Sequence, residues 1–387
     1  MKLSNNIVLK TKSGLFVRFD NDVGMFVFSP YTGLIYGVHK SDAEKIYCWL
    51  NGEIEIDDET YINTLGIGFK KSIDSAEFGK HRLLPEPTQW ANIVLSPQPL
   101  VINWLITGKC SHKCAYCYAS DMMGENTNEP NRKDIDAIIN NILSYNPLVV
   151  VLTGGEPLGS PFLNTIIELL AGKVGIIIDT NGYLYTQEHI NIFKEKNVVV
   201  RISIDSQRPQ INDKLRTLKD NKNKKQFGVV KANELLNNCL DNGIATIVHT
   251  VATKNNINDL SAMGEKFVCM GVKVWRILRL SYANEKPDIQ NDLGCKDKQY
   301  LHFYKTITEK SQRDWYNKMQ VVIQQNLERE RNGVILVSPN GKFMTESPVY
   351  GGGKILIDPD YISNPRIEIM SQRIDRWAHY NRYLNFE

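Results

Sequence analysis

The segment "VINWLITGKCSHKCAYCYA", residues 101 to 119, joins an apolar run to a loop that holds Cys110, Cys114 and Cys117. The apolar run is nearly continuous, as expected of a parallel strand that is buried on both faces. The cysteines begin where this strand ends. Because parallel α/β folds gather their chemistry at the carboxyl ends of the strands, we expect the functional site at this loop.

Five further apolar runs rich in Val and Ile follow, at 149–154, 174–180, 198–205, 243–253 and 272–280. Helical patterns lie between or after them, at 132–145, 161–172, 186–196, 228–242 and 258–270. Six strand–helix units in succession predict an α/β protein with a parallel sheet, either open and doubly wound or curved into a barrel.

The flanking regions differ from this core. The first part predicts a small α+β module with four short strands, a helix between Ser41 and Gly52, and a second short helix over 57–65. Pro85, Pro87, Pro97 and Pro99 mark a linker after it. Beyond the core we expect a long polar helix over 297–331 and a β-hairpin that turns at Asn340 and Gly341. We therefore expect four regions, which are an N-terminal module at 1–68, a linker at 69–98, a core with the parallel sheet at 99–285, and a C-terminal region at 286–387.

Composition excludes several classes of protein. The chain has 387 residues, is 42% hydrophobic and carries a net charge of +3, which gives no bulk electrostatic reason to expect nucleic acid or a membrane as partner. We find no apolar run of transmembrane length and no secretory signal, so a cytoplasmic location is expected. Seven cysteines, an odd number, argue against a disulfide framework in such a compartment.

Three clustered thiols point to a metal centre with one open position. Four thiolates close a structural zinc site, and His112 does not complete the usual zinc spacing. A [4Fe–4S] cube held by three cysteines keeps one iron free for a ligand. An incomplete zinc site remains the alternative at this point.

The spacing CxxxCxxC, with Tyr116 before the last cysteine, resembles the radical S-adenosylmethionine (SAM) superfamily. "TGGEP" (153–157), "TNG" (180–182), "SIDS" (203–206) and "NDKLR" (212–216) occur in the expected order at strand ends. The resemblance covers about residues 100 to 280. It implies a partial (βα)6 barrel in which Cys110, Cys114 and Cys117 bind one [4Fe–4S] cluster and SAM completes it.

The same resemblance assigns the SAM contacts. Gly154, Gly155 and Glu156 bind the methionyl amino group, and Ser203 and Arg216 hold the carboxylate. Tyr116 flanks the adenine, and Asp205 holds a ribose hydroxyl or a polar substrate. The cluster cleaves SAM reductively to a 5′-deoxyadenosyl radical that abstracts hydrogen from the substrate, so an external reductant is required.

The flanks suggest a substrate. Residues 1–68 resemble the winged-helix module that recognises the leader of ribosomally made precursor peptides, which such modules bind as an added strand. The alternative is a cap that only packs on the barrel. The C-terminal hairpin resembles a SPASM extension, but Thr345, Glu346 and Ser347 stand where auxiliary-cluster cysteines are usual. We therefore expect one cluster and a SPASM-like region without metal.

The expected function is a peptide-modifying enzyme, with epimerisation, cross-linking and backbone excision left open, and with a further partner protein left open too. An epimerase needs a hydrogen donor, for which the sequence offers Cys239, Cys269 and Cys295. Two alternatives remain. One is a radical SAM enzyme that acts on a small molecule or nucleic acid, and the other is a non-catalytic iron–sulfur or zinc module.

Overall fold

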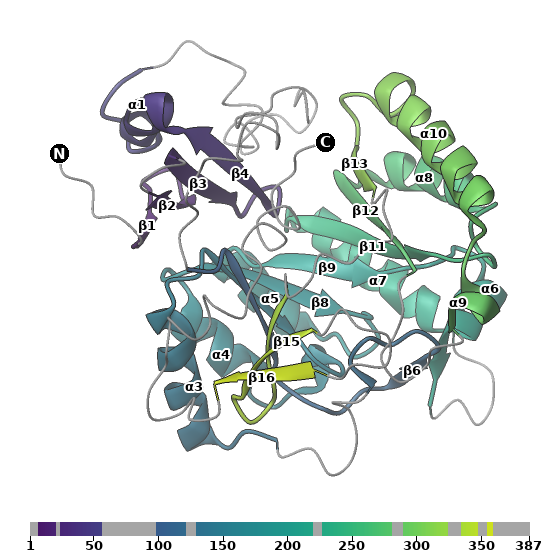
Figure 1. Ribbon diagram of the computed structural model, residues 1–387, viewed down its shortest axis with the longest axis horizontal. Helices are drawn as coiled ribbons and strands as arrows, with labels where there is room; N and C mark the ends of the chain where they lie inside the picture. The colour runs from purple at the N-terminus through teal and green to yellow at the C-terminus, as the bar shows by residue number, and fades with distance from the viewer. Residues whose placement is uncertain are drawn as a thin grey trace.

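The computed structural model describes residues 7–20, 24–55, 98–120, 129–219, 227–280, 289–323, 334–346 and 354–358. These residues form a small antiparallel sheet, a long parallel sheet with helices outside it, and a C-terminal hairpin (Figure 1). Nearly all of the expected linker 69–98 lies outside the described residues. No described helix is both long and apolar enough to cross a membrane.

The N-terminal module contains the four expected strands and the first expected helix, and the second, over 57–65, lies outside the described residues. β1 (Val8–Lys10), β2 (Phe16–Asp20), β3 (Gly24–Ser29) and β4 (Leu34–His39) pair antiparallel in that order, and α1 (Lys40–Leu50) follows. One face of this sheet packs on α1, where Val17, Val27 and Ile46 are buried together. Gly52, with φ of 70°, turns the chain after the helix.

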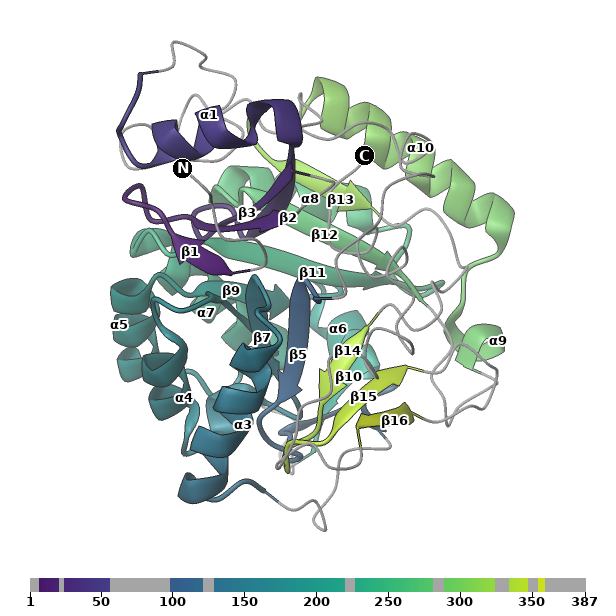
Figure 2. The ribbon, with the colours of Figure 1, turned by 60° about the vertical axis from the view of Figure 1, so that its left-hand side comes forward.

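All six expected core strands are present and pair parallel. They are β5 (Val101–Leu105), β7 (Val149–Thr153), β8 (Gly175–Thr180), β9 (Val199–Ser203), β11 (Thr246–Ala252) and β12 (Val274–Arg279). The helices that follow these strands are α3 (Arg132–Ser144), α4 (Leu163–Leu170), α5 (Gln187–Lys196), α7 (Gly228–Asp241) and α8 (Leu260–Met270). They lie along the outside of the sheet (Figure 2).

Alternate residues of each strand serve the two faces. Val150, Ile178 and Val200 are buried with residues of the helices, whereas Val149, Ile177 and Val199 belong to a separate inner cluster. This period of two on both faces explains why the strands are apolar throughout.

The predicted helix over 297–331 is wrong in its second half. α10 (Asp297–Arg313) ends before Trp315, which is fully buried against Trp275 with ring centroids 6.0 Å apart. The chain then turns through Asn317 at a φ of 61° and forms β13 (Gln320–Ile323), a seventh strand parallel to β12. Burial of one large ring therefore ends a helix that the polar pattern alone would continue.

The C-terminal hairpin is as expected but extends the main sheet. β14 (Ile335–Val337) and β15 (Phe343–Glu346) pair around Gly341, whose φ is 84°, and β16 (Lys354–Asp358) pairs with β15. β14 also pairs parallel with β5, and the Asn103 amide donates to the carbonyl of Ile335. The sheet is therefore open, with β13 at one edge and β16 at the other (Figure 2).

The N-terminal module covers the amino ends of the parallel strands. Phe28 is buried with Val101, Val149 and Val199, residues at or near the starts of three strands. A Cβ on Gly175 would lie only 2.2 Å from Cδ1 of the Phe28 ring, so a glycine at position 175 makes room for this ring. The module is thus placed at the end of the sheet opposite the cysteine loop.

Candidate functional site

The cysteine loop is fixed by a short two-stranded sheet. β6 (His112–Cys114) pairs antiparallel with β10 (Arg216–Leu218), which places Arg216 opposite Cys114. In the sequence the charged run 213–225 resembles a solvated loop, but residues 216–218 form β10 and pair with β6. Cys110, Cys114 and Cys117 are free and half-buried, at the carboxyl end of the sheet as expected.

Two glycines let this loop approach the end of β7. A Cβ on Gly154 would lie 2.4 Å from the carbonyl oxygen of Thr107, and one on Gly155 would lie 1.9 Å from that of Lys109. The Gly155 and Glu156 amides donate to these same two carbonyls, each at 2.8 Å. The structure thus gives the glycine pair a role in seating the cysteine loop, and Gly154 has a φ of 130° that disfavours other residues.

The Glu156 side chain is fully enclosed by the protein. It accepts hydrogen bonds from the Thr180 hydroxyl at 2.5 Å, the Asn181 amide at 2.8 Å and the Leu158 amide at 3.1 Å. Burial raises the pKa of Glu156 to about 7, although these hydrogen bonds oppose the shift. The carboxylate therefore ties the end of β7 to the end of β8 and caps η4 (Pro157–Gly159).

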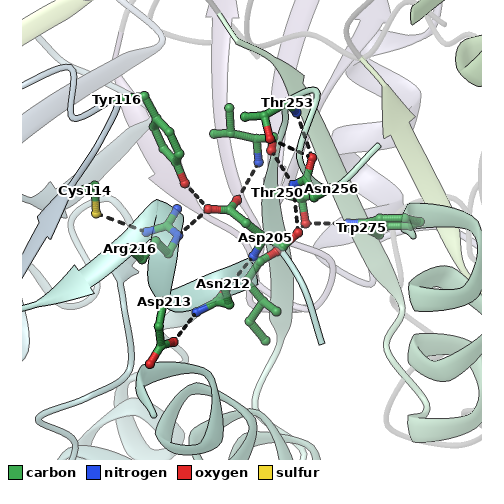
Figure 3. A network of polar contacts seen from close by, with 12 residues as sticks. Cys114, Tyr116, Asp205, Asn212, Asp213, Arg216, Thr250, Thr253, Asn256 and Trp275 are labelled. Atoms are coloured by element: carbon green, nitrogen blue, oxygen red, sulfur yellow. Dashed lines mark hydrogen bonds and ion pairs between the residues drawn. The ribbon is translucent and has the colours of Figure 1, made fainter. Parts of the chain in front are cut away.

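Asp205 and Arg216 form a buried ion pair beside the cysteines (Figure 3). Arg216 Nε donates to Asp205 Oδ2 at 2.6 Å, and the Val251 amide donates to Oδ1 at 2.8 Å. The Tyr116 hydroxyl also donates to Asp205, and the Arg216 guanidinium lies over the Tyr116 ring. Burial raises the pKa of Asp205 and the arginine opposes that shift. Three residues predicted as separate ligand contacts are therefore joined in one network.

A second layer of hydrogen bonds holds Asp205 in place (Figure 3). The Asn256 side chain is fully buried and donates to the carbonyls of Asp205 and Val251 at 2.7 and 2.9 Å. The Asn212 side chain, at the other side, accepts from the Asp205 amide at 3.1 Å. Thr250 bonds to the carbonyl of Ile204 and accepts from the Trp275 indole. The loop after β9 is consequently rigid up to the pair that faces the thiols.

Asn181 is a site residue that the sequence reasoning missed. Its side-chain amide lies 3.8 Å from Cys110 Sγ and 3.4 Å from Ser111 Oγ. Its backbone amide bonds to Glu156, and its side-chain oxygen accepts from the Tyr183 amide. The available signal was its place in "TNG" directly after β8, because polar residues at the carboxyl ends of parallel strands converge on one site.

The donor set fits an iron–sulfur cube. The three thiols are soft ligands on one loop. Burial raises the pKa of Cys110 to about 12, and the charges of Glu156, Cys114 and Cys117 act in the same direction. Thiolates that bind different irons do not converge on one point. The described residues contain no group of three or more His, Cys, Asp and Glu side chains arranged around a single ion.

The remaining predicted residues are distributed unevenly. Ser203 ends β9 next to His249 on β11, at the level of the site. Cys239 and Cys269 lie near the C-terminal ends of α7 and α8, which return toward the opposite end of the sheet, and Cys239 is fully buried. Cys295 lies between α9 (Ile289–Leu293) and α10, and the Leu293 carbonyl accepts from Lys254, just after β11. Of these three cysteines, Cys295 alone lies toward the carboxyl end of the sheet, where the cysteine loop is located.

Comparison with known proteins supports this reading of the site. The pattern of the Radical SAM superfamily matches residues 104–265. The chain is 28% identical over 204 residues to Fe-coproporphyrin III synthase of Methanosarcina barkeri, covering 52% of this chain and 49% of that protein. It is 27% identical over 186 residues to the subtilosin biosynthesis protein AlbA of Bacillus subtilis, covering 46% and 39%. It is 26% identical over 220 residues to the mycofactocin maturase MftC of Mycolicibacterium smegmatis, covering 56% and 53%. The chain spans about half the length of these curated relatives.

Solved structures share the fold across more of the chain. Streptococcus suis SuiB bound to its precursor peptide SuiA superposes with a TM-score of 0.60 at 13% identity, covering 98% of this chain and 91% of that one. The structure titled native anSMEcpe with bound AdoMet and Cp18Cys peptide gives a TM-score of 0.56 at 14% identity, covering 73% and 81%. At these identities the likeness is one of fold. The match, the thiol spacing and the site geometry together identify residues 104–265 as a radical SAM domain, a kind of domain that implies a [4Fe–4S] cluster and S-adenosylmethionine as cofactors.

Proposed function

We propose that the chain is a radical SAM enzyme that modifies a ribosomally made precursor peptide. The observation that carries the chemistry is the set of three half-buried thiols held against Gly154 and Gly155 and beside the buried Asp205–Arg216 pair. The peptide as substrate class is supported by the relatives AlbA, named for biosynthesis of the bacteriocin subtilosin, and MftC, named a mycofactocin maturase.

The chain's own residues divide the work as follows. Cys110, Cys114 and Cys117 hold the cluster, which together with SAM supplies hydrogen-abstracting chemistry when both are bound. Arg216 offers five N–H donors, and Asp205 takes the Nε donor, so the others are oriented for the SAM carboxylate with Ser203 beside it. Because Asp205 is fully buried, we propose that it orients the Arg216 side chain and does not contact the ribose.

Glycine-rich contacts complete the proposed cofactor site. Gly154, Gly155 and Glu156 end β7 directly against the cysteine loop, and the sequence resemblance assigns them to the methionyl amino group. Tyr116, held by Asp205, is proposed to flank the adenine. Cys295 is the preferred hydrogen donor among the three scattered thiols if the reaction is an epimerisation.

The test of the chemistry is direct. Anaerobically reconstituted protein is expected to carry close to four irons per chain and to release 5′-deoxyadenosine with SAM and dithionite. Cys114→Ala is expected to lose both the iron and the product. Eight or more irons would contradict the single-cluster proposal, which rests on the lack of cysteines after residue 295.

The substrate class is tested separately. The peptide encoded by a short reading frame beside this gene is incubated with the reconstituted enzyme, and its mass and deuterium content are measured. Cross-linking removes two hydrogens, excision removes a larger fragment, and epimerisation in D2O adds one deuterium without other change. A peptide that returns unmodified, while 5′-deoxyadenosine forms, would contradict the peptide proposal.

A tetrapyrrole is the second candidate substrate. Fe-coproporphyrin III synthase and AdoMet-dependent heme synthase of Methanosarcina barkeri are both relatives, at 28% and 25% identity. Iron coproporphyrin III, which the first relative is named for making, is tested in a parallel arm of the same assay as a compound for further conversion, with its mass and absorption spectrum as readouts. Turnover of this compound and not of the peptide would assign the enzyme to the small-molecule class.

We further propose that residues 1–68 recognise the leader of the peptide. β1 and β4 are the outer strands of the described module, and strand addition requires such an edge. Leu9→Pro in β1 is expected to weaken leader binding at least tenfold, with Leu9→Ala as the matched control, since proline removes a ladder donor. Unchanged affinity for the leader in Leu9→Pro and in a corresponding β4 variant would contradict this proposal and indicate that the module only packs on the sheet.

A further inference from the structure

We infer that Asn181 and Arg216 set the reduction potential of the cluster by donating hydrogen bonds to two of its thiolates. Asn181 Nδ2 lies 3.8 Å from Cys110 Sγ, and Arg216 Nη1 lies 3.9 Å from Cys114 Sγ. The inference rests on the cluster-binding part of the proposed function and is independent of the substrate.

Each donor is held by a buried carboxylate. Glu156, 1% exposed, accepts from the backbone of Asn181. Asp205, 0% exposed, accepts from Nε of Arg216 (Figure 3). These carboxylates end two different strands, β7 and β9. Because a carboxylate holds each donor residue close to its side-chain N–H groups, these groups stay directed at the sulfur atoms.

The third thiol has a different environment. Cys117 packs against an apolar cluster of Leu105, Ala119, Val334 and Leu336, two of which come from the C-terminal hairpin. Within the described residues no hydrogen bond reaches its sulfur. Two sides of the proposed cluster therefore carry polar donors and one side is apolar.

The electrostatic consequence has a definite sign. Reduction adds negative charge to the cluster and its thiolates, and N–H donors and a cation stabilise that charge. Arg216 carries a positive charge, and its Nη1 lies 3.9 Å from Cys114 Sγ. Removing either donor should make the cluster harder to reduce, with the larger effect at Arg216.

The experiment is a potentiometric titration of the reconstituted protein without SAM, read by the EPR signal of the reduced cluster. Asn181→Asp keeps the acceptor for Tyr183 and removes the donor but adds a negative charge, so Asn181→Leu, which has neither donor nor charge, is measured beside it. Asp205→Asn/Arg216→Met removes the second donor without leaving an unpaired buried charge. Asn191→Asp and Arg208→Lys are matched controls, because both residues are exposed and lie outside the cysteine loop.

At a fixed potential, the ratio of reduced to oxidised cluster is expected to fall about tenfold in the double variant, or about 59 mV for one electron, and about threefold in Asn181→Leu. The controls should match the unmodified protein. A midpoint that is unchanged or more positive, at full iron content, would overturn the inference. Loss of iron in both variants would also overturn it, since the residues would then hold the cluster instead of tuning it.

Iron content and 5′-deoxyadenosine release in the unmodified protein keep this result separate from the proposed function. Failure of either one would refute the enzyme assignment. A functional enzyme with an invariant midpoint would refute only the role of the two donors.

Discussion

The two ends of the parallel sheet are built from opposite kinds of residue. The amino end is closed by Phe28, Leu34 and Ile35 of the N-terminal module, which are packed on the valines that start the strands. The carboxyl end carries the cysteine loop, Glu156 and the Asp205–Arg216 pair. Both ends are packed, and the three clustered thiols lie at the carboxyl end.

This contrast separates stability from chemistry within one sheet. Changes at the amino end should lower the free energy of unfolding and leave the cluster intact, whereas changes at the carboxyl end should affect the cluster first. Pairs of variants at the two ends can test this separation.

The largest effect is expected from Gly155→Ala. The new Cβ would lie 1.9 Å from the Lys109 carbonyl oxygen, so the cysteine loop must move away from β7. We expect most of the bound iron to be lost, as measured by iron content and absorption after reconstitution. Gly33→Ala at the amino end is the matched control, with its Cβ 2.6 Å from Val199 and a φ of 73°. It should lower the unfolding free energy by about 1 to 3 kcal/mol and retain iron. Equal iron in both variants would refute the separation.

Phe28→Ala tests the amino end itself. The ring is fully buried against Gly175, and its removal leaves a cavity between the module and the sheet. Urea unfolding should show a loss of about 3 to 5 kcal/mol. A loss below 1 kcal/mol would mean that the module contributes little to the sheet it covers.

Arg18→Met is expected to have a smaller effect at the same end. Arg18 is fully buried and donates to the carbonyls of Pro99 and Asn146 at 2.7 Å and of Gln98 at 3.2 Å. Methionine preserves the stem and removes these hydrogen bonds, for an expected loss of about 3 kcal/mol in urea unfolding. Iron content after reconstitution should stay at the level of the unmodified protein, and a loss of iron would contradict the comparison.

The smallest effect is expected from Leu336→Val in the hairpin. Leu336 is 1% exposed and belongs to the apolar cluster beside Cys117. Loss of one methylene should cost about 1 kcal/mol. Because an apolar shell limits access of solvent, the cluster absorption should bleach in air about twofold faster. Ser338→Ala, further along the same hairpin, serves as control, and equal bleaching rates would show that the hairpin does not shield the site.

The sequence predicted the core because burial on both faces leaves a strong signal. Apolar runs located all six strands, and the spacing of Cys110, Cys114 and Cys117 located the site. The pairing of β6 with β10 had no such signal, because three-residue strands rich in polar residues resemble loops. β13 was missed because the burial of Trp315 is a tertiary effect. The roles of Asn181 and Asp205 depend on which partners the fold brings together, and those distances are not encoded locally.

The pairing of β14 with β5 has a consequence for biosynthesis. These strands are joined by a hydrogen bond between residues that are 232 positions apart, and Leu336 of β14 packs beside Cys117. At about 5 to 20 residues per second, a ribosome needs roughly 10 to 40 s to travel from Cys117 to Leu336. During that interval the nascent chain presents its thiols without their apolar neighbour. Insertion of iron is therefore expected to follow translation, after the hairpin has docked on β5, the first strand of the parallel sheet.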